Sequence, residues 1–439
     1  MASQVENLGT LERRVSMTVP VAEIDRRVDE RLKQLARSVK MPGFRPGKVP
    51  MKIVVQQYGP QVRSEVLGDA VQKAFGEAVK EANLKVAGYP RIEQKQETPP
   101  DGAAPDALEF SATFEVYPEV KLGDLSAARI ERPQVTVDDA AVEKTIQVLR
   151  KQRTIWSAVA RPVQDGDRVT VDFDARIDGQ PFEGGSGTGT AVVIGEGRML
   201  PAFEASLRGA RAGEAKTFDL RFPDDYASKQ LAGKTASFSV SVRQVEEGAL
   251  PDLDGEFARR LGVADGDVAR MRAEVRANVE REVHKRVEAR VKNQALQVLV
   301  EAAPLELPKS LVQMEAQRLL EAAAADLQSR GLKPDRVPLD PQVFEAGARR
   351  RVALGLIFAE VARAEKLQPK PAEVRALIEA EAQSYESPAE VVKWFYMQPQ
   401  RLSEMESLAL EGNVVNWVLG KAKVMEMAVS FDELMGSGS

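Results

Sequence analysis

The sequence predicts a multidomain α+β protein whose parts differ in their local patterns. Residues 1–118 combine strand-type alternation with helical periodicity, residues 152–247 hold short alternating stretches and many glycines, and residues 248–435 are nearly all helical in pattern. Residues 119–151 are expected to form a connecting arm. The length of 439 residues exceeds one ordinary core, and 43% hydrophobic with 29% charged residues is typical of a soluble folded protein.

The first part is expected to pack helices on a sheet. Residues 11–19 and 108–116 place apolar side chains at every second position, as half-buried strands do. Between them, apolar residues recur at steps of mostly three or four within 24–39 and 62–79, which predicts two amphipathic helices. The first helix must stop at Pro42, because proline restricts the residue before it.

A basic loop connects these two helices. From Arg31 to Ser64 the chain carries eight basic residues and no acidic one, although the net charge of the protein is −5. The loop itself, residues 43–50 (GFRPGKVP), adds an aromatic side chain between prolines and glycines. Cations at such a tip suit a phosphate backbone, and a proline-stiffened loop loses less entropy on docking. On charge alone, a solvated helix face with an ordinary turn is an equal alternative.

The middle part is predicted to consist of short antiparallel strands. Apolar and polar residues alternate over 169–173, 218–222 and 238–242, and Asp178-Gly179 is a strong two-residue hairpin signal. Eleven of the 31 glycines fall in this part, as tight turns require. The segment 184–189 (GGSGTG) lacks the GK[ST] ending and the following helix of a phosphate loop, so we expect a flexible hairpin loop there.

The residue inventory limits the possible chemistry. The chain has no cysteine, which excludes thiol nucleophiles, disulfides and cysteine-ligated zinc. The single histidine, His284, excludes multi-histidine metal sites, and we expect neither a metal nor a cofactor. The middle part is instead rich in aromatic residues, which core packing explains by default: Phe173, Phe182, Phe203, Phe218, Phe222, Tyr226 and Phe238.

The last part is expected to be a set of helices divided by proline. Nine prolines lie between residues 304 and 399. Six of the twelve methionines follow residue 304, which suggests an adaptable apolar binding surface, although core packing better explains any single one. The aromatic run 394–396 is either an exposed patch or a plug at a helix end, and we favour the plug.

Motifs in the first part resemble the bacterial trigger factor family, chaperones that meet nascent chains at the ribosomal tunnel exit. The loop 43–50 matches the family's ribosome-binding signature, and the similarity continues in register through 51–69 and 114–120. The resemblance implies that the loop binds the ribosome, with Phe44, Arg45 and Lys48 contacting an exit-site ribosomal protein and ribosomal RNA. The implied ribosome-binding residues are Gly43, Phe44, Arg45, Pro46, Gly47 and Lys48.

The middle part resembles prolyl isomerases of the FK506-binding-protein type. Its segments 171–173, 179–185, 195–203, 222–226 and 231–234 follow that family's order and spacing, and match the trigger factor middle domain in particular. By this resemblance one set of residues lines the isomerase pocket, with Glu183 as the acidic neighbour: Phe173, Phe182, Met199, Leu200, Phe203, Tyr226 and Phe238.

Isomerisation fits these residue types. Rotation about an X-Pro bond has a barrier of roughly 18–20 kcal/mol that is set by amide resonance, so it needs no acid, base or nucleophile. An apolar pocket strips water from the imide and favours the twisted state. The chain departs from the family at Ala202, where glycine is usual, and at Thr190, where an aromatic wall is usual. We therefore expect isomerase activity that these two positions could lower.

The helical part resembles the family's C-terminal body, with matches at 250–253, 257–263, 349–360 and 431–435. The resemblance implies an all-α chaperone body that cradles unfolded chains, an inserted isomerase domain, and an arm that packs back on the body. Residues 436–439 are expected to be a tail.

The combined expectation is a cytoplasmic, ribosome-associated chaperone that shields nascent polypeptides and isomerises X-Pro bonds. The expected partners are the ribosome and unfolded nascent chains, and neither DNA nor a membrane. Two alternatives are a free cytosolic prolyl isomerase with a substrate-recruiting helical domain and a ribosome accessory factor without chaperone action. The sequence leaves open whether free molecules form homodimers.

Overall fold

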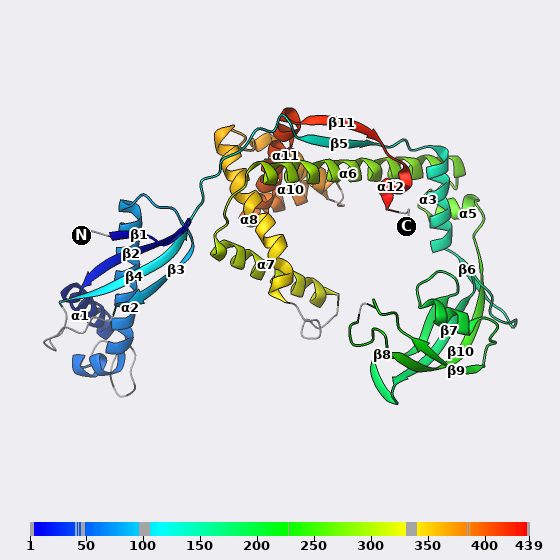
Figure 1. The fold of residues 1–439 in the computed structure, drawn as a ribbon, viewed down its shortest axis with the longest axis horizontal. Coiled ribbons are helices and arrows are strands. Elements are labelled where there is room, and N and C mark those ends of the chain that lie inside the picture. The colour runs from blue at the N-terminus through cyan, green and yellow to red at the C-terminus, as the bar shows by residue number, and fades with distance from the viewer. Residues whose placement is uncertain are drawn as a thin grey trace. The chain divides into compact units, whose positions relative to one another are not determined.

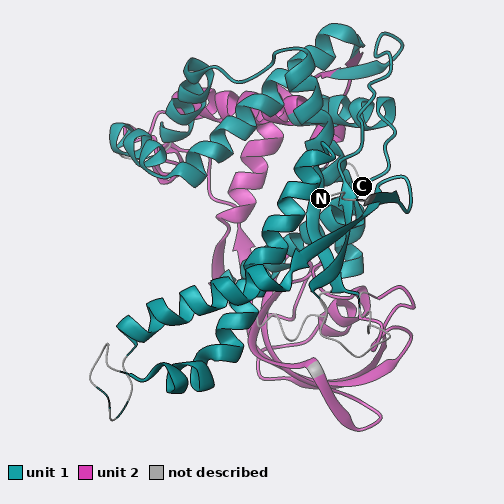
Figure 2. Ribbon diagram, turned by 90° about the vertical axis from the view of Figure 1, so that its left-hand side faces the viewer, with its two compact units in different colours: residues 1–132, 289–426 teal, residues 133–288, 427–439 magenta. Residues whose placement is uncertain are grey.

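The computed structural model describes residues 4–39, 42, 44, 49–95, 106–226, 228–330, 340–383, 385 and 387–436. The chain forms two compact units, which are coloured separately in Figure 2. Unit 1 comprises residues 1–132 and 289–426, and unit 2 comprises residues 133–288 and 427–439. Each unit therefore combines an early and a late stretch of the chain, and the 35-residue helix α6 (Val268–Ala302) contributes to both.

Unit 1 begins with a four-stranded antiparallel sheet of order β1-β2-β4-β3 (Figure 1). Strands β2 and β4 pair Met17 with Phe110, and both side chains enter a core shared with two helices. This confirms the predicted packing of helices on a sheet. The elements are β1 (Gln4–Asn7), β2 (Glu12–Pro20), α1 (Val21–Ser38), α2 (Met51–Glu81), β3 (Val86–Gln94) and β4 (Ala107–Val116).

Of the two helices on this sheet, α2 extends well beyond its apolar pattern. Helix α1 ends at Ser38, before Pro42, as expected. Helix α2 begins at Met51, well ahead of the predicted stretch, and continues through Pro60. The sequence shows no clear helical pattern for the first turns of α2, because Val54 is the one residue of α2 that is buried ahead of Val62.

The helical part of unit 1 follows its prolines. A proline is the first residue of four of its helices, where the ring fixes the backbone in a helical conformation and the missing N–H has no partner to lose. These four are α8 (Pro341–Ala364), α9 (Pro371–Ala382), α10 (Pro388–Met397) and α11 (Pro399–Lys421), and they follow α7 (Lys309–Ser329). The aromatic run in α10 is divided: Phe395 is 4% exposed and packs among α9 and α11, as the plug interpretation predicts, whereas Trp394 and Tyr396 are 40% and 46% exposed.

A carboxylate joins the sheet to the helical part within unit 1. Glu115 of β4 accepts hydrogen bonds from the backbone N–H groups of Lys309 and Ser310, at 2.9 and 2.7 Å, and from the Ser310 hydroxyl at 2.6 Å. It thereby satisfies free donors at the start of α7. Gly88 leaves room for this contact, because a Cβ there would lie 2.6 Å from the Ser310 hydroxyl oxygen.

Unit 2 contains a five-stranded sheet in which β10 lies between β7 and the strands β6 and β9. The predicted hairpin between β7 and β8 is confirmed, and its two turn residues, Asp178 and Gly179, have φ values of 52° and 78°. The elements are β6 (Ile155–Ala158), β7 (Arg168–Ile177), β8 (Gln180–Val193), α4 (Pro201–Leu207), β9 (Ala215–Arg221) and β10 (Thr235–Ala249).

One prediction for this sheet is wrong. The glycine-rich segment 184–189 is not a hairpin loop but lies inside the continuous strand β8. Two register shifts against β7 let the strand follow its partner despite its many glycines. The local composition suggested a loop because glycine is depleted in strand interiors, where it lacks a side chain to pack.

The arm and the chain end each supply a strand. Strand β5 (Arg129–Gln134) pairs with β11 (Lys423–Ala428), so the last part is not entirely helical. After β5 comes α3 (Asp139–Gln152), which Asp138 caps: its carboxylate accepts from the Ala141 N–H at 2.8 Å. The short helices α5 (Gly255–Arg260) and α12 (Phe431–Met435) complete unit 2.

Candidate functional site

A cavity of about 410 Å³ opens in the sheet domain of unit 2 and is mostly apolar. Its walls come from β7, β8, β9, β10, helix α4, the segment before that helix and the segment between β9 and β10. The lining residues are Phe173, Phe182, Gly184, Gly197, Arg198, Met199, Leu200, Pro201, Phe203, Leu220, Phe222, Tyr226, Leu231 and Phe238.

The floor of this cavity is a cluster of edge-to-face rings. Phe203 of α4 is 1% exposed, and its ring centroid lies 6.0 Å from that of Phe173 and 5.6 Å from that of Phe238. The interplanar angles of 76° and 73° match the arrangement that aromatic quadrupoles prefer. Phe218 stacks on Phe238 with the ring planes 6° apart. The floor is therefore rigid and apolar.

A second group of rings forms one side of the opening. Phe182 of β8 meets Phe222 edge to face at 6.1 Å, and Phe222 in turn lies 4.9 Å from Tyr226. Phe182 and Tyr226 are half-buried, so their faces are available to a ligand. These rings extend the apolar surface from the floor to the solvent.

The structure brings together seven of the eight residues expected at the isomerase site: Phe173, Phe182, Met199, Leu200, Phe203, Tyr226 and Phe238. The side chain of the eighth, Glu183, lies outside the described part of the chain. The expected set omitted Phe222, Leu220 and Leu231. Phe222 was among the aromatic residues noted in the sequence. It is only 4% exposed because it packs against Phe182 of the distant strand β8, a contact that the sequence does not show.

The two positions that depart from the family pattern do not belong to the described cavity lining. Ala202 is exposed in the first turn of α4, next to Phe203. Thr190 pairs with Val171 in the β7–β8 ladder.

Strand β8 approaches the floor closely. A Cβ at Gly187 would lie 2.6 Å from Phe173 Cε1, a distance that forces a shift. The strand is held there by Asp172, which accepts from the Gly189 N–H at 2.7 Å and from Arg243 Nε. The Gly189 hydrogen bond, followed by the pairing with Arg243, holds the pKa of Asp172 below its ordinary value against the opposing effect of desolvation.

The basic helix pair of unit 1 is less positive than its sequence suggests. Arg31 of α1 donates to Glu65 at 2.9 Å, and Arg63 of α2 donates to Asp25 at 2.7 Å. Both acidic partners lie just outside the acid-free stretch and reach it only because α1 and α2 pack side by side. Of the expected ribosome-binding residues, Phe44 is 38% exposed, and Gly43, Arg45, Pro46, Gly47 and Lys48 lie outside the described residues.

Comparison with known proteins gives the same division of the chain. Residues 1–149 match the family described as bacterial trigger factor protein, residues 159–243 match FKBP-type peptidyl-prolyl cis-trans isomerase, and residues 267–420 match the trigger factor C-terminus. The trigger factor of Aromatoleum aromaticum is 54% identical over 439 residues, which cover 100% of both chains. That of Azoarcus sp. strain BH72 is 55% identical over 429 residues, which cover 98% of this chain and 97% of the relative.

This chain belongs to the bacterial trigger factor family. It is a ribosome-associated chaperone with an FKBP-type peptidyl-prolyl isomerase domain, and the aromatic cavity lies in that domain. The isomerase domain is inserted between the N-terminal and C-terminal trigger factor domains.

The described residues of this trigger factor contain no group of three potential metal ligands among His, Cys, Asp and Glu side chains. Across those same residues, no helix is both long and apolar enough to span a bilayer. His284 has a 73% exposed side chain that contacts Glu288 at 3.1 Å, as expected for a surface residue.

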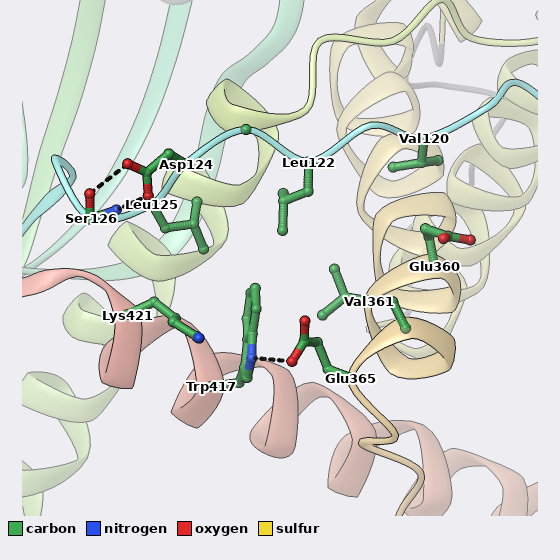
Figure 3. Close-up of a pocket in the computed structure, with 12 residues that line it drawn as sticks. Val120, Leu122, Asp124, Leu125, Ser126, Glu360, Val361, Glu365, Trp417 and Lys421 are labelled. Atoms are coloured by element: carbon green, nitrogen blue, oxygen red, sulfur yellow. Dashed lines mark hydrogen bonds between the residues drawn. The ribbon is translucent and has the colours of Figure 1, made fainter.

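The trigger factor chain has another cavity, of about 390 Å³, in unit 1 (Figure 3). Figure 3 shows Leu122 of the arm facing Val361 of α8 and Trp417 of α11, with the Trp417 indole N–H directed to Glu365 at 3.2 Å. Its charged residues already have partners nearby: Glu360 pairs with Arg363 at 2.6 Å, and Asp124 accepts from Ser126. We interpret this cavity as a gap left where the arm packs against α8 and α11.

Proposed function

We propose that the aromatic cavity of unit 2 is where this chain isomerises X-Pro bonds. The proposed pocket residues are Phe173, Phe182, Met199, Leu200, Phe203, Tyr226 and Phe238, with Glu183 as the acidic neighbour. The observation that carries the proposal is the ring cluster around Phe203, which offers a dry floor at the bottom of an opening large enough for a proline ring.

The chemistry required of this pocket is modest. The barrier of roughly 18–20 kcal/mol comes from resonance across the imide C–N bond. The twisted transition state has less charge separation in its carbonyl than the planar ground state, so an apolar environment favours it. Edge-to-face rings such as Phe173 and Phe238 exclude water without supplying a proton donor, which is the environment this reaction needs.

A protease-coupled assay on an X-Pro peptide tests the pocket. Phe182→Ala removes half-buried aromatic surface at the opening, and we expect kcat/KM to fall about tenfold or more while the domain stays folded. Ile155→Ala is the matched control, because Ile155 is 47% exposed in β6 of the same domain and does not line the cavity. Wild-type activity in Phe182→Ala would place the reaction elsewhere.

We further propose that the loop carrying Phe44, Arg45 and Lys48 contacts an exit-site ribosomal protein and ribosomal RNA, with Gly43, Pro46 and Gly47 shaping the loop. Phe44 presents an exposed ring, and Arg31 and Arg63, the neighbouring cations with acidic partners, are neutralised by Glu65 and Asp25. Because these partners offset two of the eight cations of the stretch, we expect the loop cations to supply a larger share of the salt-sensitive attraction than the sequence alone suggests.

Cosedimentation with ribosomes across a salt series tests this contact. The Phe44→Ala, Arg45→Ala, Lys48→Ala variant should lose salt-sensitive binding. The control variant Tyr117→Ala, Lys121→Ala, Arg129→Ala also removes one exposed aromatic ring and two exposed cations, and should bind as wild type does. If both variants bind equally well, the loop is not the contact, and if wild type stays unbound at low salt, a free cytosolic isomerase becomes the better description.

The remaining proposals concern the body and the cellular setting. We propose a ribosome-binding domain at 1–118, an arm at 119–151 that packs with the C-terminal body, an isomerase domain at 152–247 and a chaperone body at 248–435. The arm helix α3 supports this division, since Glu143 receives a 2.8 Å hydrogen bond from Arg272 of α6. We propose that the protein is cytoplasmic and shields nascent chains. Whether it forms homodimers away from the ribosome is tested by sedimentation of the free protein over a concentration series.

A further inference from the structure

Glu204 is a buried carboxylate of the isomerase domain to which the reaction described above assigns no part. It lies in α4 directly after Phe203 and is only 4% exposed. Its Oε2 accepts from the Gly195 N–H at 2.8 Å, and its Oε1 accepts from the Met199 N–H at 3.3 Å. The two oxygens therefore bind the two ends of one loop, residues 195–199.

This loop forms one wall of the aromatic cavity. Gly197, Arg198 and Met199 line the cavity, and Leu200 follows as the N-cap of α4. The loop has little structure of its own, since Gly195 and Gly197 have φ values of 92° and 68°, which only glycine adopts readily. Gly195 to Arg198 are exposed, so packing does not hold them in place.

The side chain of Glu204 is well suited to hold such a loop. Burying a carboxylate is costly unless hydrogen bonds satisfy it, and here the only hydrogen-bond donors found to it among the described residues are backbone N–H groups of the loop. The loop and the carboxylate therefore stabilise each other. Opening the loop would leave a buried carboxylate oxygen without a partner, which restricts the loop to one conformation.

We propose that Glu204 is a positioning residue of the isomerase, which fixes loop 195–199 so that Met199 and Leu200 form the wall of the substrate pocket. This inference rests on the proposed assignment of the reaction to that pocket. Glu204 does not line the cavity itself, and it acts through the loop backbone. Because positioning errors of about 1 Å can cost up to a hundredfold in rate, a loosened wall should lower turnover of X-Pro peptides.

The decisive variant is Glu204→Gln, which keeps the size of the side chain but presents an NH₂ group to one of the two N–H donors. We expect kcat/KM on an X-Pro peptide to fall about tenfold. Hydrogen–deuterium exchange of peptides covering 194–200 should become faster, while peptides covering β7 and β10 should exchange as in wild type. Glu196→Gln is the matched control, because Glu196 lies in the same loop but has a 43% exposed side chain that pairs with Arg198 at the surface.

The outcomes separate the two proposals. If Phe182→Ala is inactive and Glu204→Gln keeps kcat/KM within twofold of wild type, the positioning role is wrong and the pocket stands. If Glu204→Gln accelerates exchange in β7 and β10 as much as in the loop, Glu204 stabilises the whole domain and the positioning role is also wrong. If Phe182→Ala keeps full activity, the pocket assignment fails and the positioning role fails with it. Glu204→Ala, which removes both acceptors, should show the same pattern as Glu204→Gln with a larger loss.

Discussion

Arg161 donates two hydrogen bonds to Asp167 at the entry to the isomerase domain, from Nη1 to Oδ2 at 2.6 Å and from Nη2 to Oδ1 at 2.9 Å. The Asp167 side chain is 3% exposed and also accepts from the Gln164 N–H at 2.8 Å. Burial by itself raises the pKa of Asp167, but the hydrogen bonds and the charge of Arg161 outweigh it, so the pKa lies below its ordinary value. This pair connects the segment after β6 to the start of β7.

Removing the arginine should destabilise the domain. Arg161→Leu leaves Asp167 buried without its cation. We expect the free energy of unfolding that protects β7 to fall by about 3 kcal/mol. Hydrogen exchange of β7 measures it. The control is Arg176→Leu, which breaks the exposed pair with Asp174, whose side chains are 58% and 48% exposed, and should change the same free energy by less than about 0.5 kcal/mol. Equal losses in the two variants would contradict the special role of the buried pair.

The same pair predicts a dependence of stability on pH. A carboxylate whose folded pKa is lowered contributes its full stabilisation above the ordinary pKa of 3.8, and this contribution is lost as the pH falls through the lowered folded value. The free energy of unfolding of wild type should therefore exceed that of Asp167→Asn by the largest amount at pH 6. This difference should become steadily smaller below pH 4. Urea midpoints from near-ultraviolet circular dichroism measure this gap, and a gap independent of pH would refute the assignment.

Strand β8 should tolerate no side chain at Gly187. In Gly187→Ala the new Cβ would lie 2.6 Å from Phe173 and 2.8 Å from Thr190 Oγ1, so the strand or the pocket floor must move. We expect kcat/KM for X-Pro peptides to fall roughly tenfold. The neighbouring exposed residue provides the control, since Thr188→Ala should leave activity unchanged. A folded Gly187→Ala protein with activity close to wild type would show that the pocket does not depend on this contact.

Helix α10 carries exposed apolar surface, which we expect to contact unfolded clients. Met397 is 80% exposed and Tyr396 is 46% exposed, whereas Phe395 between Trp394 and Tyr396 packs in the core. Met397→Ser, Tyr396→Ser should weaken suppression of client aggregation several-fold and leave isomerase activity unchanged, because each lost apolar contact removes part of a weak binding surface. Lys393→Ser on the same helix should have no effect on either measurement. Undiminished suppression in the double variant would place client binding elsewhere.

Motifs that follow one another at the family's spacing predicted seven residues that meet at one aromatic cavity. The sequence was misleading where charge or glycine content was judged from one stretch of chain without its spatial neighbours. The stretch from Arg31 to Ser64 looked wholly basic, but packing of α1 against α2 brings Glu65 and Asp25 to two of its arginines. The glycines of 184–189 suggested a loop, but pairing with β7 makes them part of a strand.

Features that depend on a few adjacent residues were determined by the sequence itself. The Asp178-Gly179 turn, the Asp138 cap and the prolines that begin four helices all act on their own backbone, where the local chain decides the outcome. Only the tertiary structure decided the pairing of β5 with β11 and the hydrogen bonds between Glu204 and loop 195–199. These contacts form between separate elements, and their free energy depends on burial and geometry that arise only when the chain has folded.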